Sequence, residues 1–500
     1  FALFGDSWAG HHLTNLLLYL ASCSLFLAVL GDLLGSRKAA WAGAALFALH
    51  PAHVESVAWL ASRKDVLSLL FFMAAVLAFL RAGRPMLWAT VLGLCAYWSK
   101  NTAIALPPLL AALSVTHLGG RPARPRWWLD WLPMAAVFGA GLWITIHVGG
   151  EVRMFAGQRE AGLAAKAALA AGSWLEHLRI LLWPAGLSVL YPEPPIQPLA
   201  SPAGAAGSAV IAACLAGPLL LWKRRPSMAA GLWWFGMGML PVSQIVPIQN
   251  LVADRYLLLP SAGACLLVAA AWPLKSPRWL AAIPACAVLA LAALTVERIP
   301  AWRSAESLWG DLCTKQPLEP RGWTSLAGHY TDRGEWDKAE SVLGDGFEAL
   351  PGHPELLQGE GLLRLKKGEP DAAEDLLRQA LASDPSLRKA SNNLAILLHR
   401  SHRSEEARKL MDGTLKEHPI YPVGWNTLGT IHLDSGRIDE AEAAFLESVR
   451  LSPGAALPLA NLGNVAYVRE DWSAAEDWWR KSLEADPALQ HSVKPSSQPR

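Results

Sequence analysis

The chain has 500 residues, of which 52% are hydrophobic and 17% are charged, and its formal net charge is +2. This length is long for one domain, and the charges are distributed unevenly. Residues 1–300 hold 21 Lys and Arg against 11 Asp and Glu, whereas the rest of the chain holds 23 against 31. The early basic residues stand in short clusters between apolar runs, which excludes a nucleic-acid-binding surface. The six cysteines form neither a disulfide framework nor a zinc-binding pattern.

Apolar runs dominate residues 1–297 and predict a multi-span membrane domain, because about 20 apolar residues are needed for a helix to cross a bilayer. Ten helices are expected, at 13–31, 39–52, 66–81, 86–99, 101–116, 130–148, 205–223, 227–246, 256–274 and 278–296. Lys and Arg cluster in alternate loops, and the positive-inside rule assigns those loops to the cytoplasm. The other loops, and the chain after residue 297, are then expected outside the cytosol.

The long external loop at 149–204 is expected to contain structure of its own. Residues 166–183 have apolar positions at helical spacing, interrupted by Glu176, His177 and Arg179. This pattern predicts an amphipathic helix at the outer membrane interface. The segment that follows is rich in proline and is expected to be extended.

From residue 320 the sequence repeats with a period of 34 residues. Proline recurs at this interval, as Pro351, Pro385, Pro419, Pro453 and Pro487. A period of 34 is typical of tetratricopeptide repeats, which are pairs of antiparallel helices. Five units are predicted over 320–487, after a connector with half a repeat at 298–319 and before a disordered tail at 488–500. The predicted fold class is therefore all-α, with a transmembrane helical domain followed by an α-solenoid.

One polar stretch interrupts the membrane domain, HPAHVESVAWLASRKDVL from His50 to Leu67. A charged side chain at mid-bilayer costs about 2.5–3.5 kcal/mol, so this cluster is expected in a surface loop or in a wet functional cavity. The loop assignment places it on the external side. An alternative is that its charged residues form ion pairs that only anchor two helices.

The order of these features resembles bacterial relatives of the transmembrane and tetratricopeptide repeat O-mannosyltransferases, in the C-type integral-membrane glycosyltransferase superfamily. The resemblance includes YWSKNTAIALP at 97–107, LLWPAGLSVLYPEPP at 181–195 and VADRYLLLP at 252–260. It implies transfer of a sugar, expected to be mannose, from a polyprenyl-phosphate carrier to a hydroxyl of a protein or other acceptor. The repeats would bind the acceptor or partner proteins, and no cofactor is expected.

The resemblance also implies a catalytic acidic residue in the first external loop. In this chain that loop is reduced to residues 1–15, and the acidic pair and a first helix are expected to lie upstream of Phe1. A bacterial cytoplasmic membrane is the expected location, with the repeats outside the cytosol. The alternative function is a non-catalytic membrane scaffold that uses its repeats to gather partner proteins.

The chemistry of such a transfer selects the candidate site residues. An inverting transfer needs a carboxylate to take the proton of the acceptor hydroxyl, and it needs cations to hold the phosphate. The expected carboxylates are Glu55 and Asp65. The expected phosphate-side residues are Arg63, Lys64, Lys100 and Arg255, with His53, His11 and Asn15 as further candidates. No metal site is expected, because His50, His53 and Glu55 lack a metalloprotease spacing.

Overall fold

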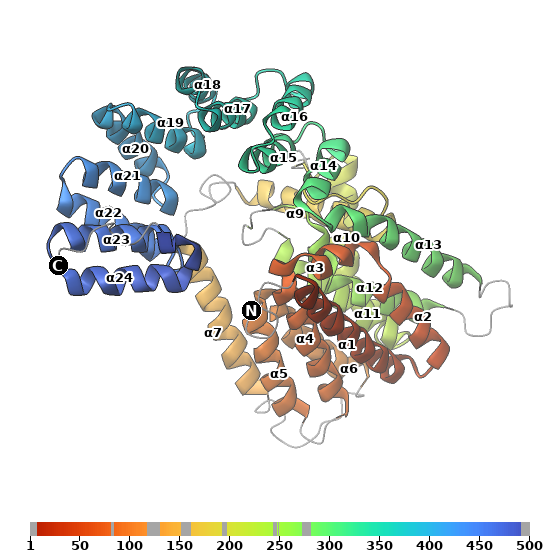
Figure 1. The fold of residues 1–500 in the computed structure, drawn as a ribbon. Coiled ribbons are helices and arrows are strands. Elements are labelled where there is room, and N and C mark those ends of the chain that lie inside the picture. The colour runs from red at the N-terminus through yellow and green to blue at the C-terminus, as the bar shows by residue number, and fades with distance from the viewer. Residues whose placement is uncertain are drawn as a thin grey trace. The chain divides into compact units, whose positions relative to one another are not determined.

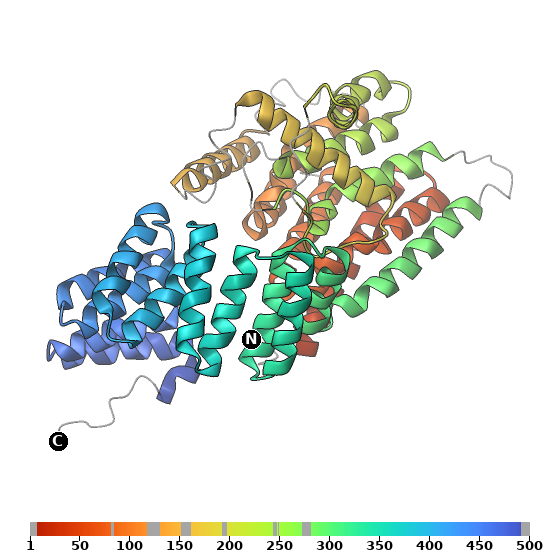
Figure 2. The same ribbon diagram turned by 90° about the horizontal axis from the view of Figure 1, so that it is seen from above.

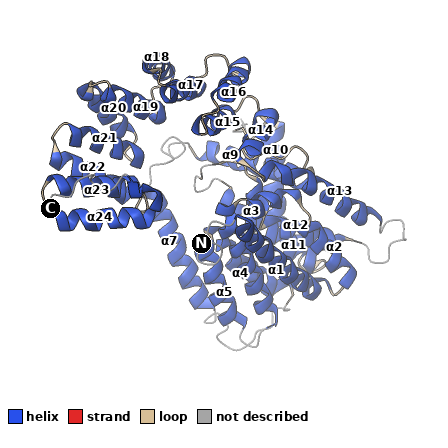
Figure 3. Cartoon of the chain, viewed as in Figure 1, coloured by secondary structure: helices blue, strands red, loops and turns tan. Residues whose placement is uncertain are grey.

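The computed structural model of the chain describes residues 8–81, 85–117, 131–151, 162–192, 198–243, 248, 250–272 and 282–491. These residues form helices and connecting turns and contain no strand (Figure 3). The predicted all-α fold class is therefore confirmed. The chain divides into two units, Phe1–Gln316 and Pro317–Arg500 (Figure 1).

The first unit contains helices that overlap each of the ten apolar ranges. They are α1 (Trp8–Leu34), α2 (Arg37–Ala48), α3 (Val54–Ala58), α4 (Arg63–Arg81), α5 (Pro85–Ser99), α6 (Leu106–Thr116), α7 (Leu132–Glu151), α9 (Leu163–Leu182), α10 (Pro202–Leu221), α11 (Pro226–Met239), α12 (Pro260–Ala271), α13 (Ala282–Arg298) and α14 (Ala305–Lys315). Short 3₁₀ turns connect several of them: η1 (Pro51–His53), η2 (Leu60–Ser62), η3 (Asn101–Ala105), η5 (Leu240–Val242), η6 (Asp254–Leu257) and η7 (Ile299–Trp302).

Three helical segments of the described residues are long and apolar enough to cross a membrane: Ala9–Leu34, Pro202–Leu221 and Ala282–Trp302. Shorter apolar helices accompany them, among them Met86–Ser99 and Pro260–Ala271. This composition is that of a membrane protein. The side of the membrane on which each loop lies stays a prediction.

The core of the first unit is formed mainly by α1, α2, α4, α6, α11 and α12. Phe26, Phe47, Phe72 and Trp234 are fully or almost fully buried there. Helices α11 and α12 approach closely because glycine lies at their contact, and a Cβ on Gly231 would stand 2.7 Å from the Leu267 backbone nitrogen. Small residues of this kind allow helix backbones to pack without a hydrophobic driving force.

The stretch from His50 to Leu67 folds as a series of short turns between α2 and α4. His50 caps η1, since its Nδ1 accepts from the Ala52 backbone N–H at 3.3 Å, and Pro51 suits the first turn because it has no N–H to satisfy. Trp59 is in an extended conformation and separates α3 from η2. Because of these breaks, the stretch forms several short segments instead of one continuous helix.

Helix α9 has a buried face that includes Ala171, Trp174 and His177, and it packs against α10. Glu176 and Arg179 form an exposed ion pair at 2.7 Å on another side of the helix. The amphipathic pattern at 166–183 therefore corresponds to a helix with one face against protein. Residues 193–197 of the proline-rich segment after it lie outside the described residues.

The second unit consists of five helical hairpins, whose helices lie side by side in sequence order (Figure 2). The helices are α15 (Pro320–Asp332), α16 (Trp336–Ala349), α17 (Pro354–Lys367), α18 (Pro370–Ser383), α19 (Arg388–Arg400), α20 (Ser404–Glu417), α21 (Pro422–Asp434), α22 (Ile438–Leu451), α23 (Ala456–Val468) and α24 (Trp472–Ala485). The half repeat expected before them corresponds to α14, which lies in the first unit. Of the tail predicted at 488–500, the last nine residues lie outside the described part, and η8 (Pro487–His491) occupies its start.

Proline and tryptophan of the repeats are linked by hydrogen bonds that recur in register. The indole N–H of Trp323 donates to the Pro317 carbonyl at 2.9 Å, and that of Trp425 donates to the Pro419 carbonyl at 2.8 Å. Each tryptophan thus joins the first helix of a hairpin to the turn before it. These two contacts indicate a packing role for Trp323 and Trp425.

Glycine is required where the two helices of a hairpin cross. A Cβ on Gly361 would stand 2.9 Å from the Leu377 side chain, and one on Gly429 would stand 2.6 Å from the Phe445 ring. In both hairpins the glycine precedes the large residue by sixteen positions. By contrast, Gly413 in α20 has no atom within 4 Å of an added Cβ.

We predict opposite effects for two alanine substitutions in the repeats. Gly429→Ala is expected to destabilise the α21–α22 hairpin by about 1–3 kcal/mol, because the new methyl group overpacks against Phe445. Gly413→Ala is the matched control and is expected to stabilise α20 by about 0.5–1 kcal/mol through helix propensity. Hydrogen exchange of the full chain, followed by mass spectrometry, measures both changes. Unchanged exchange in α21 and α22 of Gly429→Ala would contradict the proposed close contact.

Candidate functional site

A cavity of about 410 Å³ lies where the polar stretch after α3 meets the turns η3, η5 and η6. Its wall combines apolar side chains such as Trp59, Leu142 and Val242 with a polar set. The polar residues on the wall are Ser62, Lys64, Asp65, Lys100, Asn101, Thr102, Arg255 and Tyr256. Five separate segments of the sequence contribute to this wall: 59–65, 100–104, Leu142, 241–242 with Ile248, and 255–256.

Glu55 and Arg255 form the contact that holds the most distant of these segments together. The side chain of Glu55 is 1% exposed. Its Oε2 accepts from the Arg255 backbone N–H at 2.9 Å, and its Oε1 accepts from Arg255 Nη1 at 2.5 Å. Both carboxylate oxygens are thus occupied, and Glu55 is not on the cavity wall. Its position fixes Arg255, which is on the wall.

The Arg255 guanidinium also lies between two aromatic rings. Its Cζ stands 5.4 Å from the centre of the Trp59 ring and 5.1 Å from that of Tyr256, within the range of cation–π attraction. Burial by itself lowers the pKa of Arg255, and the Glu55 carboxylate more than offsets this, so the pKa is raised. Arg255 is therefore a permanently charged group in a fixed orientation.

Asp65 and Lys100 form a second ion pair, and both residues line the cavity. Asp65 lies in the first turn of α4 and is 4% exposed. Its Oδ1 accepts from Lys100 Nζ, and its Oδ2 has no hydrogen-bond partner among the described residues. A buried carboxylate oxygen without a partner is costly. Asp65 is therefore the carboxylate of this site that has an oxygen left for a ligand.

Lys100 follows α5 and has its ammonium group at the cavity. Burial lowers the pKa of Lys100 to about 7, and repulsion from Arg255 and Lys64 contributes to the lowering. The charge of Glu55 opposes this effect. Lys64 is exposed and completes the set of cations. Three cations against the carboxylates of Glu55 and Asp65 leave one net positive charge, which suits an anionic ligand.

The side chains of Arg63 and its neighbour Lys64 lie in different surroundings. Arg63 Nε donates to Asn15 Oδ1 at 2.8 Å, and Nη2 donates to the His11 carbonyl at 3.1 Å. Asn15 Nδ2 in turn donates to the Val57 carbonyl at 3.1 Å. Arg63, His11 and Asn15 thus form a polar cluster against the start of α1, and none of the three is on the cavity wall.

His53 is also placed away from the cavity, in the core of the first unit. Its Nδ1 is 2.7 Å from the Tyr19 hydroxyl, and its Nε2 is 2.9 Å from Ser261 Oγ. His50 Nε2 is 3.1 Å from the Leu181 carbonyl. These histidines connect helices instead of facing a ligand. The described residues contain no group of three or more His, Cys, Asp or Glu side chains that could hold a metal ion.

Several residues of the cavity were not among those selected from the sequence, namely Trp59, Asn101, Thr102 and Tyr256. Each lies within four residues of a charged residue that was selected from the sequence. The charged residues therefore marked the right segments, although these four side chains were not selected. Asp254 precedes Arg255 and accepts from the Tyr191 hydroxyl at 2.5 Å. Burial raises the pKa of Asp254 to about 8, and the charge of Glu55 adds to this.

The comparisons with known proteins cover both units. The tetratricopeptide repeat family model matches residues 359–422 and 426–489. A solved structure of PilF from Pseudomonas aeruginosa is 21% identical, covers 34% of this chain and 77% of its own, and has a TM-score of 0.31. The repeats predicted from the period of 34 residues are confirmed over the matched residues.

Along most of the chain, the similarity is to proteins named O-mannosyl-transferases. Protein O-mannosyl-transferase TMTC3 of Mus musculus is 22% identical over 88% of this chain and 54% of its own length. Protein O-mannosyl-transferase Tmtc1 of Drosophila melanogaster is 36% identical over 22% of this chain and 14% of its own. At its greatest coverage, the chain spans only about half the length of these curated relatives. The chain is thus similar in sequence to proteins named O-mannosyl-transferases, and it carries tetratricopeptide repeats in its second unit.

Proposed function

We propose that the chain is a membrane glycosyltransferase that moves a sugar, expected to be mannose, from a polyprenyl-phosphate carrier to a hydroxyl of an acceptor. The observation that carries the proposal is the convergence of Lys64, Lys100 and Arg255 with the unpaired oxygen of Asp65 on one cavity. The names of the relatives that match most of the chain support the same reaction class.

The three cations suit the phosphate of the donor. A sugar phosphodiester carries one negative charge, and the leaving polyprenyl phosphate carries more, so positive charge at the cavity favours the transition state over the ground state. Arg255 offers a planar guanidinium held in place by Glu55, and guanidinium groups pair well with phosphate oxygens. Lys64 and Lys100 add two point charges beside it.

Asp65 is the residue that we assign to the acceptor. In the reaction, the acceptor O–H bond breaks and its proton passes to Asp65 Oδ2 while the oxygen bonds to carbon 1 of the sugar. The bond between carbon 1 and the phosphate oxygen breaks, and its electron pair leaves with the polyprenyl phosphate. The contact between Oδ1 and Lys100 favours the ionised form that can accept this proton.

Glu55 is assigned a positioning role, because both of its oxygens are bonded to Arg255. Arg63, His11, Asn15 and His53 support the framework around the cavity. The repeats are proposed to bind the acceptor protein or partner proteins on the extracytoplasmic side, through the concave surface that such solenoids form in general.

A second candidate function is a membrane-anchored scaffold without catalysis. It is favoured by the repeats, since tetratricopeptide hairpins occupy the described part of the second unit. In that case the ion pairs of the cavity would only hold the helices together. Activity measurements on cavity variants separate the two functions.

We predict that Asp65→Asn lowers kcat by about 10²–10⁴, because the amide cannot accept the proton, while donor binding is largely retained. Lys64→Gln is expected to raise KM for the donor by about tenfold, the loss of one partly exposed phosphate contact. Lys38→Gln, an exposed lysine in the first turn of α2, is the matched control and should behave as the parent. The assay uses the full chain with polyprenyl-phosphate mannose and a Ser/Thr-containing polypeptide.

A folded Asp65→Asn protein that transfers mannose as fast as the parent would refute the role of Asp65. If the parent itself transfers no sugar from polyprenyl-phosphate donors while it still binds partner proteins through its repeats, the scaffold function stands.

We also predict that donor affinity decreases as the pH rises above about 7. A bound phosphate raises the pKa of Lys100, so affinity is full below the pKa of the free protein and falls by up to about tenfold per pH unit above it. The phosphodiester itself does not titrate in this range. In Lys100→Arg the charge persists, so the affinity profile between pH 6 and 9 should be flatter. Asp254 is present in both proteins and cannot account for a difference between them. Identical profiles for the parent and Lys100→Arg would exclude Lys100 as the titrating group.

A further inference from the structure

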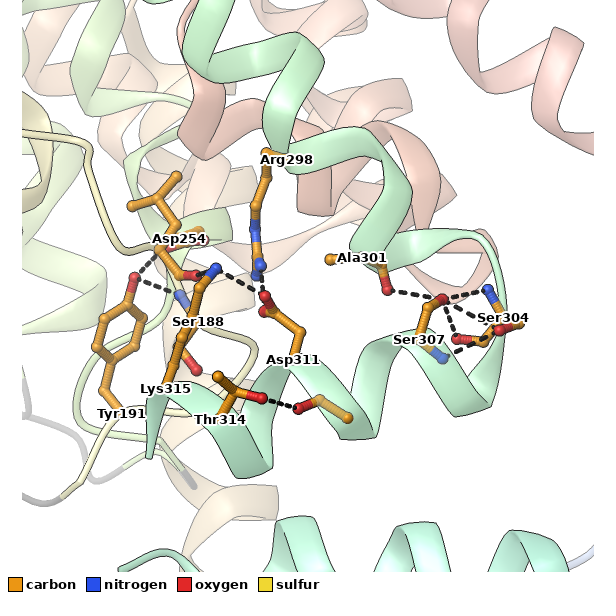
Figure 4. A network of polar contacts seen from close by, with 12 residues as sticks. Ser188, Tyr191, Asp254, Arg298, Ala301, Ser304, Ser307, Asp311, Thr314 and Lys315 are labelled. Atoms are coloured by element: carbon orange, nitrogen blue, oxygen red, sulfur yellow. Dashed lines mark hydrogen bonds and ion pairs between the residues drawn. The ribbon is translucent and has the colours of Figure 1, made fainter. Parts of the chain in front are cut away.

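A second cavity, of about 210 Å³, lies at the end of α13 and is separate in its lining from the proposed transferase site. It is bounded by the turn at 184–187, the last turns of α13, and the side chains of Asp311 and Lys315 from α14. Figure 4 shows Arg298 extending from the end of α13 toward Asp311, with Lys315 beside it. No step of the proposed transfer uses this cavity.

Arg298 has hydrogen-bond capacity that the described residues leave unused. Its side chain is 4% exposed, and Nη1 donates to Asp311 Oδ2 at 2.6 Å. Its Nε and Nη2 have no acceptor. Trp302, whose ring centre is 5.7 Å from the guanidinium carbon, likewise has an indole N–H without a partner. The two unpartnered donors of Arg298, which lines the cavity, point to a ligand rich in acceptor oxygens, since unsatisfied buried donors are costly.

The charges of the cavity favour a ligand with one negative charge. Asp311 accepts from Arg298 and from Lys315, whose Nζ is 2.8 Å from Oδ1. Lys315 also donates to the Leu187 carbonyl at 2.8 Å, which holds it at the wall. Two cations share one carboxylate here, so one positive charge remains. Glu297, on the rim, is exposed to solvent, which weakens its effect.

The position of the cavity along the chain indicates where such an anion comes from. Arg298 lies near the end of Ala282–Trp302, one of the three segments that are apolar and long enough to span a membrane. Leu289 and Val296 on this segment are 69% and 67% exposed. Arginine and tryptophan at the end of a span stand at the depth of lipid headgroups, and the exposed apolar side chains face acyl chains.

We propose that this cavity binds the phosphodiester of an anionic phospholipid, with the free edge of Arg298 on the phosphate oxygens and the acyl chains along α13. The proposal is independent of the proposed transferase function. A planar guanidinium with two adjacent free N–H groups can contact two phosphate oxygens at once. Basic pockets beside transmembrane helices are a general means of holding anionic headgroups.

The test titrates phosphatidylglycerol into the full chain, delipidated in neutral detergent, and counts bound lipid by native mass spectrometry. Arg298→Gln is expected to weaken binding by about 10- to 100-fold, the loss of a charge-assisted contact, and Lys315→Met should weaken it by a smaller factor. Arg303→Gln, which removes an exposed arginine five residues further on, is the control and should bind as the parent does.

Three further ligands distinguish the source of the binding energy: inorganic phosphate, glycerophosphoglycerol (the same headgroup without acyl chains) and diacylglycerol (chains without phosphate). Weak binding of all three, beside tight binding of the phospholipid, supports the proposal. Diacylglycerol that binds as tightly as phosphatidylglycerol would overturn it. Headgroup or phosphate binding as tight as that of the lipid would leave an anion site but overturn the lipid as its source.

Lys315→Met keeps the test decisive if Arg298→Gln does not fold, because Lys315 is partly exposed and the Arg298–Asp311 pair remains in that variant. Phosphatidylglycerol binding by folded Lys315→Met that equals the parent's at every concentration would also overturn the proposal.

Discussion

The ion pair between Glu55 and Arg255 is the interaction on which the candidate site depends. It joins the short helix α3 to the turn η6, which is 200 residues away, in a unit dominated by apolar helices. Removing one partner of a buried pair leaves an uncompensated charge, which costs about 3–5 kcal/mol. The cost of burying charge therefore forces these two segments together, and the cavity is the space that remains beside their contact.

The same constraint explains why carboxylates and cations that look equivalent in the sequence differ in the structure. Glu55 has both oxygens bonded and faces protein, whereas Asp65 has one oxygen bonded and the other without a partner at the cavity. A carboxylate that holds an arginine cannot also accept a proton without releasing it. The different roles proposed for Glu55 and Asp65 follow from how many of their oxygens already accept hydrogen bonds. The spacing of the residues along the chain does not show this.

The sequence contained enough information for the helices and the repeats, because both depend on local periodicity. Apolar runs mark the helices of the first unit, and Pro at intervals of 34 marks the hairpins of the second. The cavity depends instead on contacts between distant segments. Arg63 and Lys64 are neighbours with the same charge, yet one bonds to Asn15 and the other faces the cavity. The two side chains differ only in the direction in which they extend from the start of α4. A pattern of charges along the sequence does not show this direction.

The turn η6 connects the two polar regions of the first unit. Its Asp254 accepts from the Tyr191 hydroxyl, and the next residue, Arg255, is bonded to Glu55 and lines the first cavity. The charges of Arg298 and Lys315 lower the pKa of Asp254, but burial raises it by more. An anion held by Arg298 would reduce this influence and favour the protonated form of Asp254. The charge on Asp254, which precedes Arg255, would then depend on the occupant of the second cavity.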